Sequence, residues 1–434
     1  MARKMKDSGI EWIGKIPEKW EIRKIKNNFM IYAGATPKSE KAEYWDGGIP
    51  WITPADFKTT DKYVSYGRKS LTALGYDSCG TTLVPAGSII FSKRAPVGSV
   101  VIAKNTLCTN QGCLACIPND AVNSTYFYYC MSIFTEQFEL VSAGTTFKEI
   151  AASTFASFLL PCPPLSQQNE IVNFLDKESS RIDSMLSKTR SSIEEYKKLK
   201  QAVITQAVTK GVRGEREMKD SGVEWIGEIP KKWNRCKLNS ICTFINGDRS
   251  KNYPSSEDFQ DIGIPFIGAD SLNGFFVDTY SARHISPAKY ASMGGLKITQ
   301  GDILYTLRGS TIGKNAIANF NDGTIASSLV GIRVKSPFLA SSSFLFYWLN
   351  SLNEFVQRDL CINGSTAPNL SAENVAQFFI YIPDITEQHE IADYLDAKCA
   401  EIDKLIAKKE QLVKELDSYK KSLIYEVVTG KREV

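Results

Sequence analysis

The chain has 434 residues, 43% of them hydrophobic and 23% charged, a composition typical of a globular protein with two to four domains. It has neither an N-terminal signal pattern nor a run of 18 apolar residues, which argues against secretion and a membrane span. Ten cysteines without a regular framework suit a reducing cytoplasm, and a net charge of +4 permits nucleic-acid binding without arguing for it.

The first predicted element is a tryptophan-rich segment that occurs twice. Residues 5–20 read MKDSGIEWIGKIPEKW and residues 218–233 read MKDSGVEWIGEIPKKW, with identity at 13 of 16 positions. We call residues 7–20 and 220–233 the straps; the Ile-Pro pair in each favours extended backbone before the proline. The repeat predicts a molecule with pseudo-two-fold symmetry, which suits an approximately two-fold partner such as duplex DNA.

A mixed region follows each strap, at about 21–164 and about 234–383. In the first, short apolar runs broken by Gly and Pro predict strands at 49–52, 88–91 and 99–103. Apolar residues at helical spacing predict helix over 126–140 and over 344–360, so each region is expected to be an α+β domain.

The two mixed regions are faintly similar to each other. Residues 48–52 resemble 263–267, residues 85–92 resemble 299–306, and residues 144–146 resemble 364–366. The residues between these landmarks differ widely. This pattern predicts one scaffold with two different surfaces.

A long helix is predicted after each mixed region. Apolar residues every 3.5 positions predict that the two helices pack as an antiparallel coiled coil, and roughly 40 residues at about 1.5 Å each give a spacer of about 60 Å. Both seams are polar at the same two steps, Thr189/Lys409 and Lys200/Lys420. The repeat also predicts that the first strap docks beside Thr429. The predicted seam residues are Leu175, Ile182, Leu186, Ile193, Val203, Leu395, Ile402, Ile406, Val413 and Leu423.

Residues suited to catalysis or metal binding are scarce. Of the two histidines, His389 is interpreted as a solvated helix-start residue and His284 as a surface-loop residue. Cys108, Cys113 and Cys116 alternate with small apolar residues and are interpreted as buried strand cysteines, so no metal site is expected. A stand-alone enzyme acting on DNA through scattered carboxylates (Asp56, Asp270 and Asp302) stays open as an alternative.

Several polar loops are candidates for DNA contact, because base edges are read by Arg, Lys, Asn and Gln, with Ser and Thr at the phosphates around them. Arg94 and Arg308 follow equivalent predicted strands and are the strongest single-residue candidates. The full set is Lys38, Lys41, Lys93, Arg94, Asn110, Gln111, Thr145, Thr146, Lys148, Arg249, Lys251, Asn252, Arg308, Lys314, Ser365 and Asn369.

The whole chain resembles the DNA-specificity subunits of Type I restriction–modification enzymes. The resemblance rests on the straps (SGIEWIGKIPEKW, SGVEWIGEIPKKW) and on Leu/Ile-x-x-Gln-x-Glu-Ile-x-x-Phe/Tyr-Leu-Asp at the start of each long helix. It implies an α+β fold with two pseudo-symmetric α/β target recognition domains, separated by two long helices packed as an antiparallel coiled coil. The implied divisions are 1–164 (strap and first recognition domain), 165–212 (central spacer helix), 213–384 (strap and second recognition domain) and 385–434 (C-terminal spacer helix).

The same resemblance implies a function and a set of partners. Each recognition domain would read one half of an asymmetric bipartite site in double-stranded DNA. The helices would fix the gap and dock two modification (methyltransferase) subunits, which restriction (translocase-nuclease) subunits then join. The chain itself would be non-catalytic, because S-adenosylmethionine, ATP and magnesium belong to the partners. The recognition subunit of a Type IIB-like system is an alternative that differs only in its partners.

Overall fold

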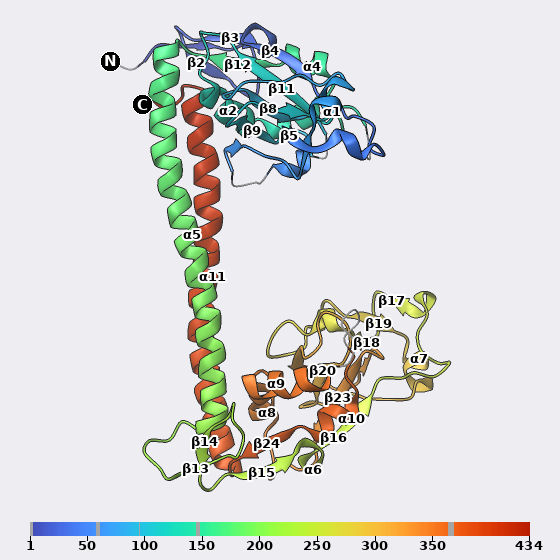
Figure 1. Cartoon of the computed structure of the whole chain (residues 1–434). Coiled ribbons are helices and arrows are strands. Elements are labelled where there is room, and N and C mark those ends of the chain that lie inside the picture. The colour runs from blue at the N-terminus through green and yellow to red at the C-terminus, as the bar shows by residue number, and fades with distance from the viewer. Residues whose placement is uncertain (1–2, 58–60, 95, 145–147, 363–368) are drawn as a thin grey trace. The chain divides into compact units, whose positions relative to one another are not determined.

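The computed structural model describes residues 3–57, 61–94, 96–144, 148–362 and 369–434 (Figure 1). The chain divides into two compact units: unit 1 holds residues 1–189 and 411–434, and unit 2 holds residues 190–410. Across the described ranges, no helix has the length and apolar character needed to cross a membrane.

In unit 1 the first part of the first strap lies in an antiparallel hairpin of β1 (Met5–Asp7) and β2 (Lys15–Pro17). The strap turns back on itself through Gly9 and Gly14, which both have positive φ, a conformation that glycine adopts without strain. The other elements are β3 (Glu21–Lys24), β4 (Phe29–Ala33), β5 (Trp45–Ile52), β6 (Tyr63–Val64), β7 (Lys69–Leu71), α1 (Ala73–Asp77), β8 (Ile89–Ser92), β9 (Val100–Ala103), β10 (Cys108–Thr109), β11 (Cys113–Pro118), α2 (Ser124–Ile133), α3 (Thr135–Leu140), α4 (Ala152–Ser157) and β12 (Leu159–Cys162).

The central strands of one sheet in unit 1 are buried on both faces. One sheet has the order β4-β11-β8-β9-β6, a second has β10-β5-β7, and β12 pairs with β3. Along β8, Ile89 and Phe91 belong to one hydrophobic cluster and Ile90 to another. Because alternate side chains of a strand point to opposite faces, this sheet lies between two cores.

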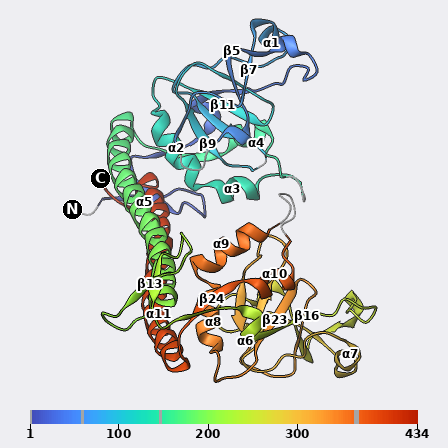
Figure 2. The same ribbon diagram turned by 60° about the horizontal axis from the view of Figure 1, so that its bottom comes forward.

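In unit 2 the second strap precedes the mixed region, and its first part lies in an antiparallel hairpin of β13 (Met218–Asp220) and β14 (Glu228–Pro230). Its elements run from light green to orange in Figure 2. They are β15 (Asn234–Lys237), α6 (Leu238–Ile241), β16 (Cys242–Asn246), β17 (Phe259–Gln260), β18 (Ile264–Ile267), β19 (Arg283–Ile285), α7 (Pro287–Ser292), β20 (Ile303–Thr306), β21 (Asn315–Ile317), β22 (Thr324–Ile325), β23 (Leu329–Val334), α8 (Ser342–Leu349), α9 (Leu352–Cys361), α10 (Ala372–Gln377) and β24 (Phe379–Ile382).

The two mixed regions share one topology. The order β16-β23-β20-β21 in unit 2 repeats β4-β11-β8-β9 of unit 1, with antiparallel pairing throughout. The order β22-β18-β19 repeats β10-β5-β7, including the parallel pairing of the first two strands. They differ at the margins, where β6 joins β9 in unit 1 and β17 joins β19 in unit 2. The expected common scaffold is confirmed.

The single helix expected in each mixed region is wrong in detail, because each is broken into two. In unit 1, α2 and α3 are separated at Phe134, whose φ and ψ are −100° and 24°. In unit 2 the break falls at Asn350 and Ser351, whose side chains donate to the carbonyls of Phe346 and Trp348. Such local bonds compete with helix continuation. Phe134 is itself buried, so the apolar spacing runs through the break and conceals it.

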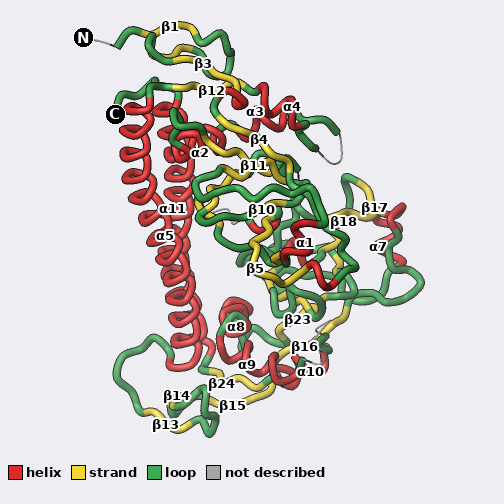
Figure 3. The backbone as a smooth tube through the Cα atoms, turned by 45° about the horizontal axis from the view of Figure 1, so that its top comes forward, coloured by secondary structure: helices red, strands yellow, loops and turns green. Residues whose placement is uncertain are grey.

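The long helices are α5 (Leu165–Lys210) and α11 (Ile385–Val428), and each contributes to both units. They lie side by side within each unit (Figures 1 and 3). In unit 1, Lys420 pairs with Asp183 at 2.6 Å, and in unit 2, Lys200 pairs with Asp403 at 2.7 Å. Residue numbers rise along one helix as they fall along the other, so the helices are antiparallel. The expected fold class is confirmed.

The predicted apolar seam residues are buried or half-buried. Lys200 and Lys420, expected as polar steps of the seam, each reach an aspartate on the opposite helix. Thr189 is buried and donates to the Met185 carbonyl at 2.8 Å. Of the named apolar seam residues, Val203, Ile406 and Val413 are half-buried and the others are buried: Leu175, Ile182, Leu186, Ile193, Leu395, Ile402 and Leu423.

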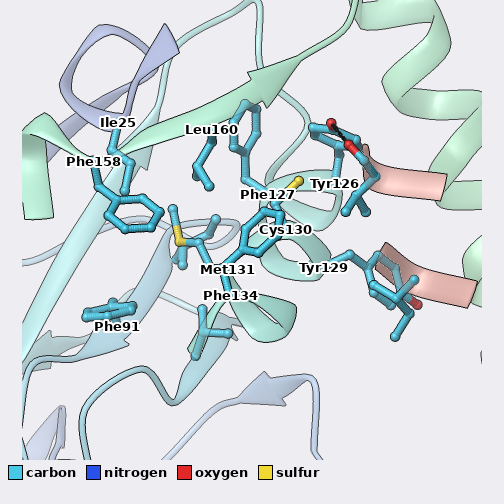
Figure 4. Packing of buried hydrophobic residues seen from close by; sticks show 14 of the residues in the cluster. Ile25, Phe91, Tyr126, Phe127, Tyr129, Cys130, Met131, Phe134, Phe158 and Leu160 are labelled. Atoms are coloured by element: carbon cyan, nitrogen blue, oxygen red, sulfur yellow. Dashed lines mark hydrogen bonds between the residues drawn. The ribbon is translucent and has the colours of Figure 1, made fainter. Parts of the chain in front are cut away.

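The first strap docks against the end of α11, as expected. The Tyr425 hydroxyl donates to the Trp12 carbonyl at 2.9 Å. Trp20 and Val428 belong to the same hydrophobic cluster, and β1 and the C-terminal end of the chain lie at the same end of the paired helices (Figure 3). In Figure 4, Tyr126 and Phe127 belong to that cluster, and the Tyr126 hydroxyl donates to the Val428 carbonyl at 2.9 Å.

The residues repeated at the start of each long helix attach the mixed region to that helix. The buried Gln168 side chain accepts from the Asn123 backbone N–H at 2.8 Å, and Gln388 accepts from that of Ser341 at 2.9 Å. A second pair of hydrogen bonds repeats this attachment further along each long helix: the Tyr129 hydroxyl donates to Asp176 at 2.6 Å, and that of Tyr347 donates to Asp396 at 2.5 Å. These repeated residues therefore have the same structural role in both copies, which is to attach the mixed region to its long helix.

Candidate nucleic-acid interface

The two arginines singled out from the sequence occupy the same place in the fold. Arg94 follows β8 and forms an antiparallel backbone bridge with Glu149. Arg308 follows β20, the equivalent strand, and forms an antiparallel bridge with Asn369. The predicted equivalence therefore extends to their backbone partners.

The charges around this bridge differ between the units. In unit 1, Glu149 lies 2.7 Å from the Lys93 ammonium and 3.5 Å from the Arg94 guanidinium. The hydrogen bond from Lys93 lowers the pKa of Glu149, so the carboxylate stays ionised. The candidate Lys148 also faces a carboxylate, that of Glu139, at 3.9 Å.

In unit 2 the bridge carries no such carboxylate. Asn369 stands in the place of Glu149, and both Asn369 and Arg308 are exposed. Within the described residues, Arg308 has no ion-pair partner. The unit 2 surface therefore presents a guanidinium and an amide where unit 1 presents a compensated guanidinium–carboxylate pair.

Two further candidate loops of unit 1 lie against each other. A Cβ on Gly34 would come within 2.3 Å of the Thr109 and Asn110 carbonyl oxygens, so only glycine fits there. The Thr36 hydroxyl contacts the Gln111 side chain. Asn110 uses its side-chain oxygen to accept from the Gly112 N–H at 2.9 Å, which shapes the loop. Lys38 and Lys41 are exposed on the same stretch, with Lys41 3.4 Å from Glu43.

The matching loop of unit 2 is held by a buried aspartate. Burial opposes ionisation of Asp248, but the backbone N–H groups of Ser250 and Gly294, at 2.6 and 2.8 Å, lower its pKa overall. Arg249 and Lys251 are exposed on this loop. The half-buried Asn252 donates to the Ser292 carbonyl at 2.8 Å.

The remaining candidates are distributed as follows. Lys314 is half-buried and donates to the Asn273 side chain at 2.7 Å and the Ala269 carbonyl at 3.1 Å, so part of its donor capacity is already used. Thr145, Thr146 and Ser365 lie outside the described residues.

Of the three carboxylates weighed for catalysis, Asp56 and Asp302 have structural partners. Asp56 accepts from the Thr53 backbone N–H at 2.8 Å and Thr53 hydroxyl at 2.7 Å. The buried Asp302 pairs with Arg333 at 2.7 Å, and Asp270 lies in a short 3-10 turn. Within the described residues, no group of three or more His, Cys, Asp or Glu side chains could hold a metal.

The cysteine interpretation is confirmed, and one histidine interpretation is wrong. Cys108 lies in β10, and Cys113 and Cys116 in β11; all three are buried. Burial raises the pKa of each thiol, that of Cys108 to about 12. His389 is exposed on α11 as expected. His284 is half-buried in β19 opposite Pro265, rather than in a surface loop.

Comparison with known proteins assigns the family. The Type I restriction modification DNA specificity domain profile matches residues 17–195 and 230–415. The Type I restriction enzyme MjaIX specificity subunit of Methanocaldococcus jannaschii is 28% identical over 384 residues, covering 86% of this chain and 84% of its own length. The EcoBI specificity subunit of Escherichia coli is 24% identical, covering 90% and 81%.

Solved structures share the fold. A chain from a structure of the type I R-M system superposes with a TM-score of 0.73 at 16% identity, covering 96% of this chain and 99% of its own. The HsdS subunit from Thermoanaerobacter tengcongensis gives 0.54 at 16% identity, covering 96% and 98%. The chain belongs to the Type I restriction modification DNA specificity domain family.

Proposed function

We propose that this protein is the DNA sequence-recognition subunit of a Type I restriction–modification complex, with each unit reading one half of an asymmetric bipartite site. The observation that carries this proposal is that one strand topology occurs twice while the exposed side chains at equivalent positions differ. Arg94 is bridged to Glu149 in one copy, and Arg308 to Asn369 in the other. A common scaffold with different polar side chains suits two unrelated half-sites.

In this proposal the long helices set the gap between the half-sites and dock two modification subunits, which restriction subunits then join. Docking is supported by large apolar side chains exposed along both helices. They include Met185 and Leu199 on α5, and Leu412 and Tyr419 on α11. Apolar side chains left exposed to solvent are available to pack against a protein partner.

The chemistry is assigned to the partners. S-adenosylmethionine, ATP and magnesium would be bound by the modification and restriction subunits, and the assembly would act on cytoplasmic DNA. The purified chain, given S-adenosylmethionine and its target duplex, should transfer no methyl group until the modification subunit is added. Methyl transfer by the chain alone would contradict this assignment.

The spacer role can be tested by lengthening both helices together. We would insert seven helix-forming residues after Thr189 in α5 and seven after Glu410 in α11, where the chain passes from one unit to the other. Seven residues keep the apolar seam in phase and add about 10 Å, roughly 3 base pairs at about 3.4 Å each. Methylome sequencing of cells carrying the variant and its modification partner should show a gap about 3 base pairs longer, with both half-sites unchanged.

The matched control places seven Gly/Ser residues beside Gly214, in an exposed loop outside both helices. That insertion should leave the gap unchanged. An unaltered gap in the folded, active helix variant would reject the spacer role.

A further inference from the structure

Glu149 is an unexpected residue at a surface proposed to bind a polyanion. Its side chain is 40% exposed and so is that of Arg94, although Glu149 pairs with Lys93 at 2.7 Å. A carboxylate repels phosphate and offsets part of the attraction of the cations beside it. Its place is therefore unfavourable for phosphate contact, and part of the carboxylate stays open to solvent despite its pairing with Lys93.

The geometry of the bridge limits what that partner can be. The antiparallel backbone bridge holds Arg94 and Glu149 side by side, with a guanidinium nitrogen 3.5 Å from a carboxylate oxygen. The unit thus presents donors next to an acceptor. In the major groove, a G·C pair presents the complement: the O6 and N7 acceptors of guanine beside the N4 amino donor of cytosine.

We infer that Glu149 is a specificity-determining residue, which accepts a hydrogen bond from the N4 amino group of a cytosine in the half-site read by unit 1. Arg94, beside it, donates to the guanine of the same or the adjacent pair. This inference rests on the proposed function. At the equivalent bridge of unit 2, Asn369 offers an amide, which matches the N6 donor and N7 acceptor of adenine. The two half-sites therefore differ at this position, with cytosine for unit 1 and adenine for unit 2.

The alternative is that Glu149 only anchors its loop. Its backbone already does so, because Glu149 and Ala143 exchange N–H···O bonds of 2.9 and 3.0 Å. Ile150 also donates to the Lys93 carbonyl at 3.0 Å. A substituted side chain at 149 therefore leaves the backbone anchor in place.

The test exchanges the two bridge residues in the full complex. Methylome sequencing would compare cells carrying the modification partner with the wild-type chain, Glu149→Asn or Asn369→Glu. Glu149→Asn should change one base of one half-site from cytosine towards adenine, leaving the other half-site and the gap unchanged. Asn369→Glu should make the reverse change in the other half-site. The matched control is Glu139→Gln, which removes a neighbouring carboxylate facing Lys148 and should leave the motif intact.

Binding by the reconstituted complex gives a second measurement with Glu149→Gln, which keeps the side-chain size. The wild type should prefer the cytosine duplex over one substituted at that base by about tenfold to 100-fold, and the variant should lose this preference. An equal gain in affinity for every duplex would overturn the inference, as would an unchanged motif in the Glu149→Asn variant. A wild-type complex that methylates no bipartite site would instead refute the proposed function itself.

Discussion

The hydroxyl of Tyr126 connects the first recognition domain to the far end of the chain. The ring is fully buried, and the hydroxyl donates to the Val428 carbonyl at 2.9 Å and the Pro161 carbonyl at 3.2 Å. Tyr126→Phe removes this donor without changing the packing of the ring. The carbonyl oxygen of Val428, the last residue of α11, then loses the hydrogen bond from residue 126.

The expected loss of stability follows from leaving a buried carbonyl oxygen without a hydrogen-bond donor. A buried polar group that loses its partner costs about 1–3 kcal/mol. Unit 1 contains 189 and 24 residues from its two segments. For a unit of that size, about 1 kcal/mol lowers the melting temperature by about 2–4 °C, so the unit 1 transition should fall by about 2–12 °C.

Calorimetry with hydrogen exchange would measure this loss and locate it. Faster exchange is expected in residues 421–430 of the Tyr126→Phe variant, whereas unit 2, which has Phe344 at the equivalent place, should not change. Tyr128→Phe is the control, because Tyr128 contacts the Lys62 ammonium through its ring, 5.9 Å from the centroid. If Tyr126→Phe melts with the wild type and residues 421–430 stay protected, the proposed connection is wrong.

Three further substitutions test contacts of the long helices by thermal unfolding. Thr205→Tyr should stabilise unit 2 by about 1 kcal/mol, because the ring would fill an apolar groove of about 500 Å³ lined by Thr205, the residue that corresponds to Tyr425 in the repeat. The Leu352 N–H, which now donates to the Thr205 hydroxyl at 3.0 Å, is exposed and can bond to water instead; a lower melting temperature would contradict this prediction. Gln388→Ala should cost about 2–4 kcal/mol, because the buried amide bonds three backbone groups, and a loss below about 1 kcal/mol would show that water replaces it. Lys200→Asp should lower the free energy of unfolding by less than about 1 kcal/mol, because its pair with Asp403 is partly exposed. Adding Asp403→Lys should recover that loss, and a double variant less stable than both single variants would exclude the pairing.

The long helices and the straps could be predicted because their sequence patterns are local. The seam spacing of α5 and α11 repeats every few residues, and the straps are near-identical copies. The helix breaks could not be predicted, because Phe134 keeps the apolar spacing intact while its backbone leaves the helix.

The candidate interface was predicted less completely. The equivalence of Arg94 and Arg308 could be predicted because both follow similar strands. The pairing of Glu149 with Arg94 could not be predicted, because nothing in the sequence spacing shows that residue 149 lies beside residue 94. Non-local strand register decides that contact, as it decides that His284 is a strand residue.

The discontinuity of unit 1 has a consequence during translation. Unit 2 is one uninterrupted stretch, 190–410, whereas the core of unit 1 takes Leu423, Ile424, Val427 and Val428 from beyond it. During synthesis, the first recognition domain therefore cannot complete its hydrophobic core until the whole of unit 2 has been made, and part of its apolar surface stays exposed until then. A premature stop codon near residue 411 would leave the later-made half with all of its residues and the earlier-made half without part of its interior.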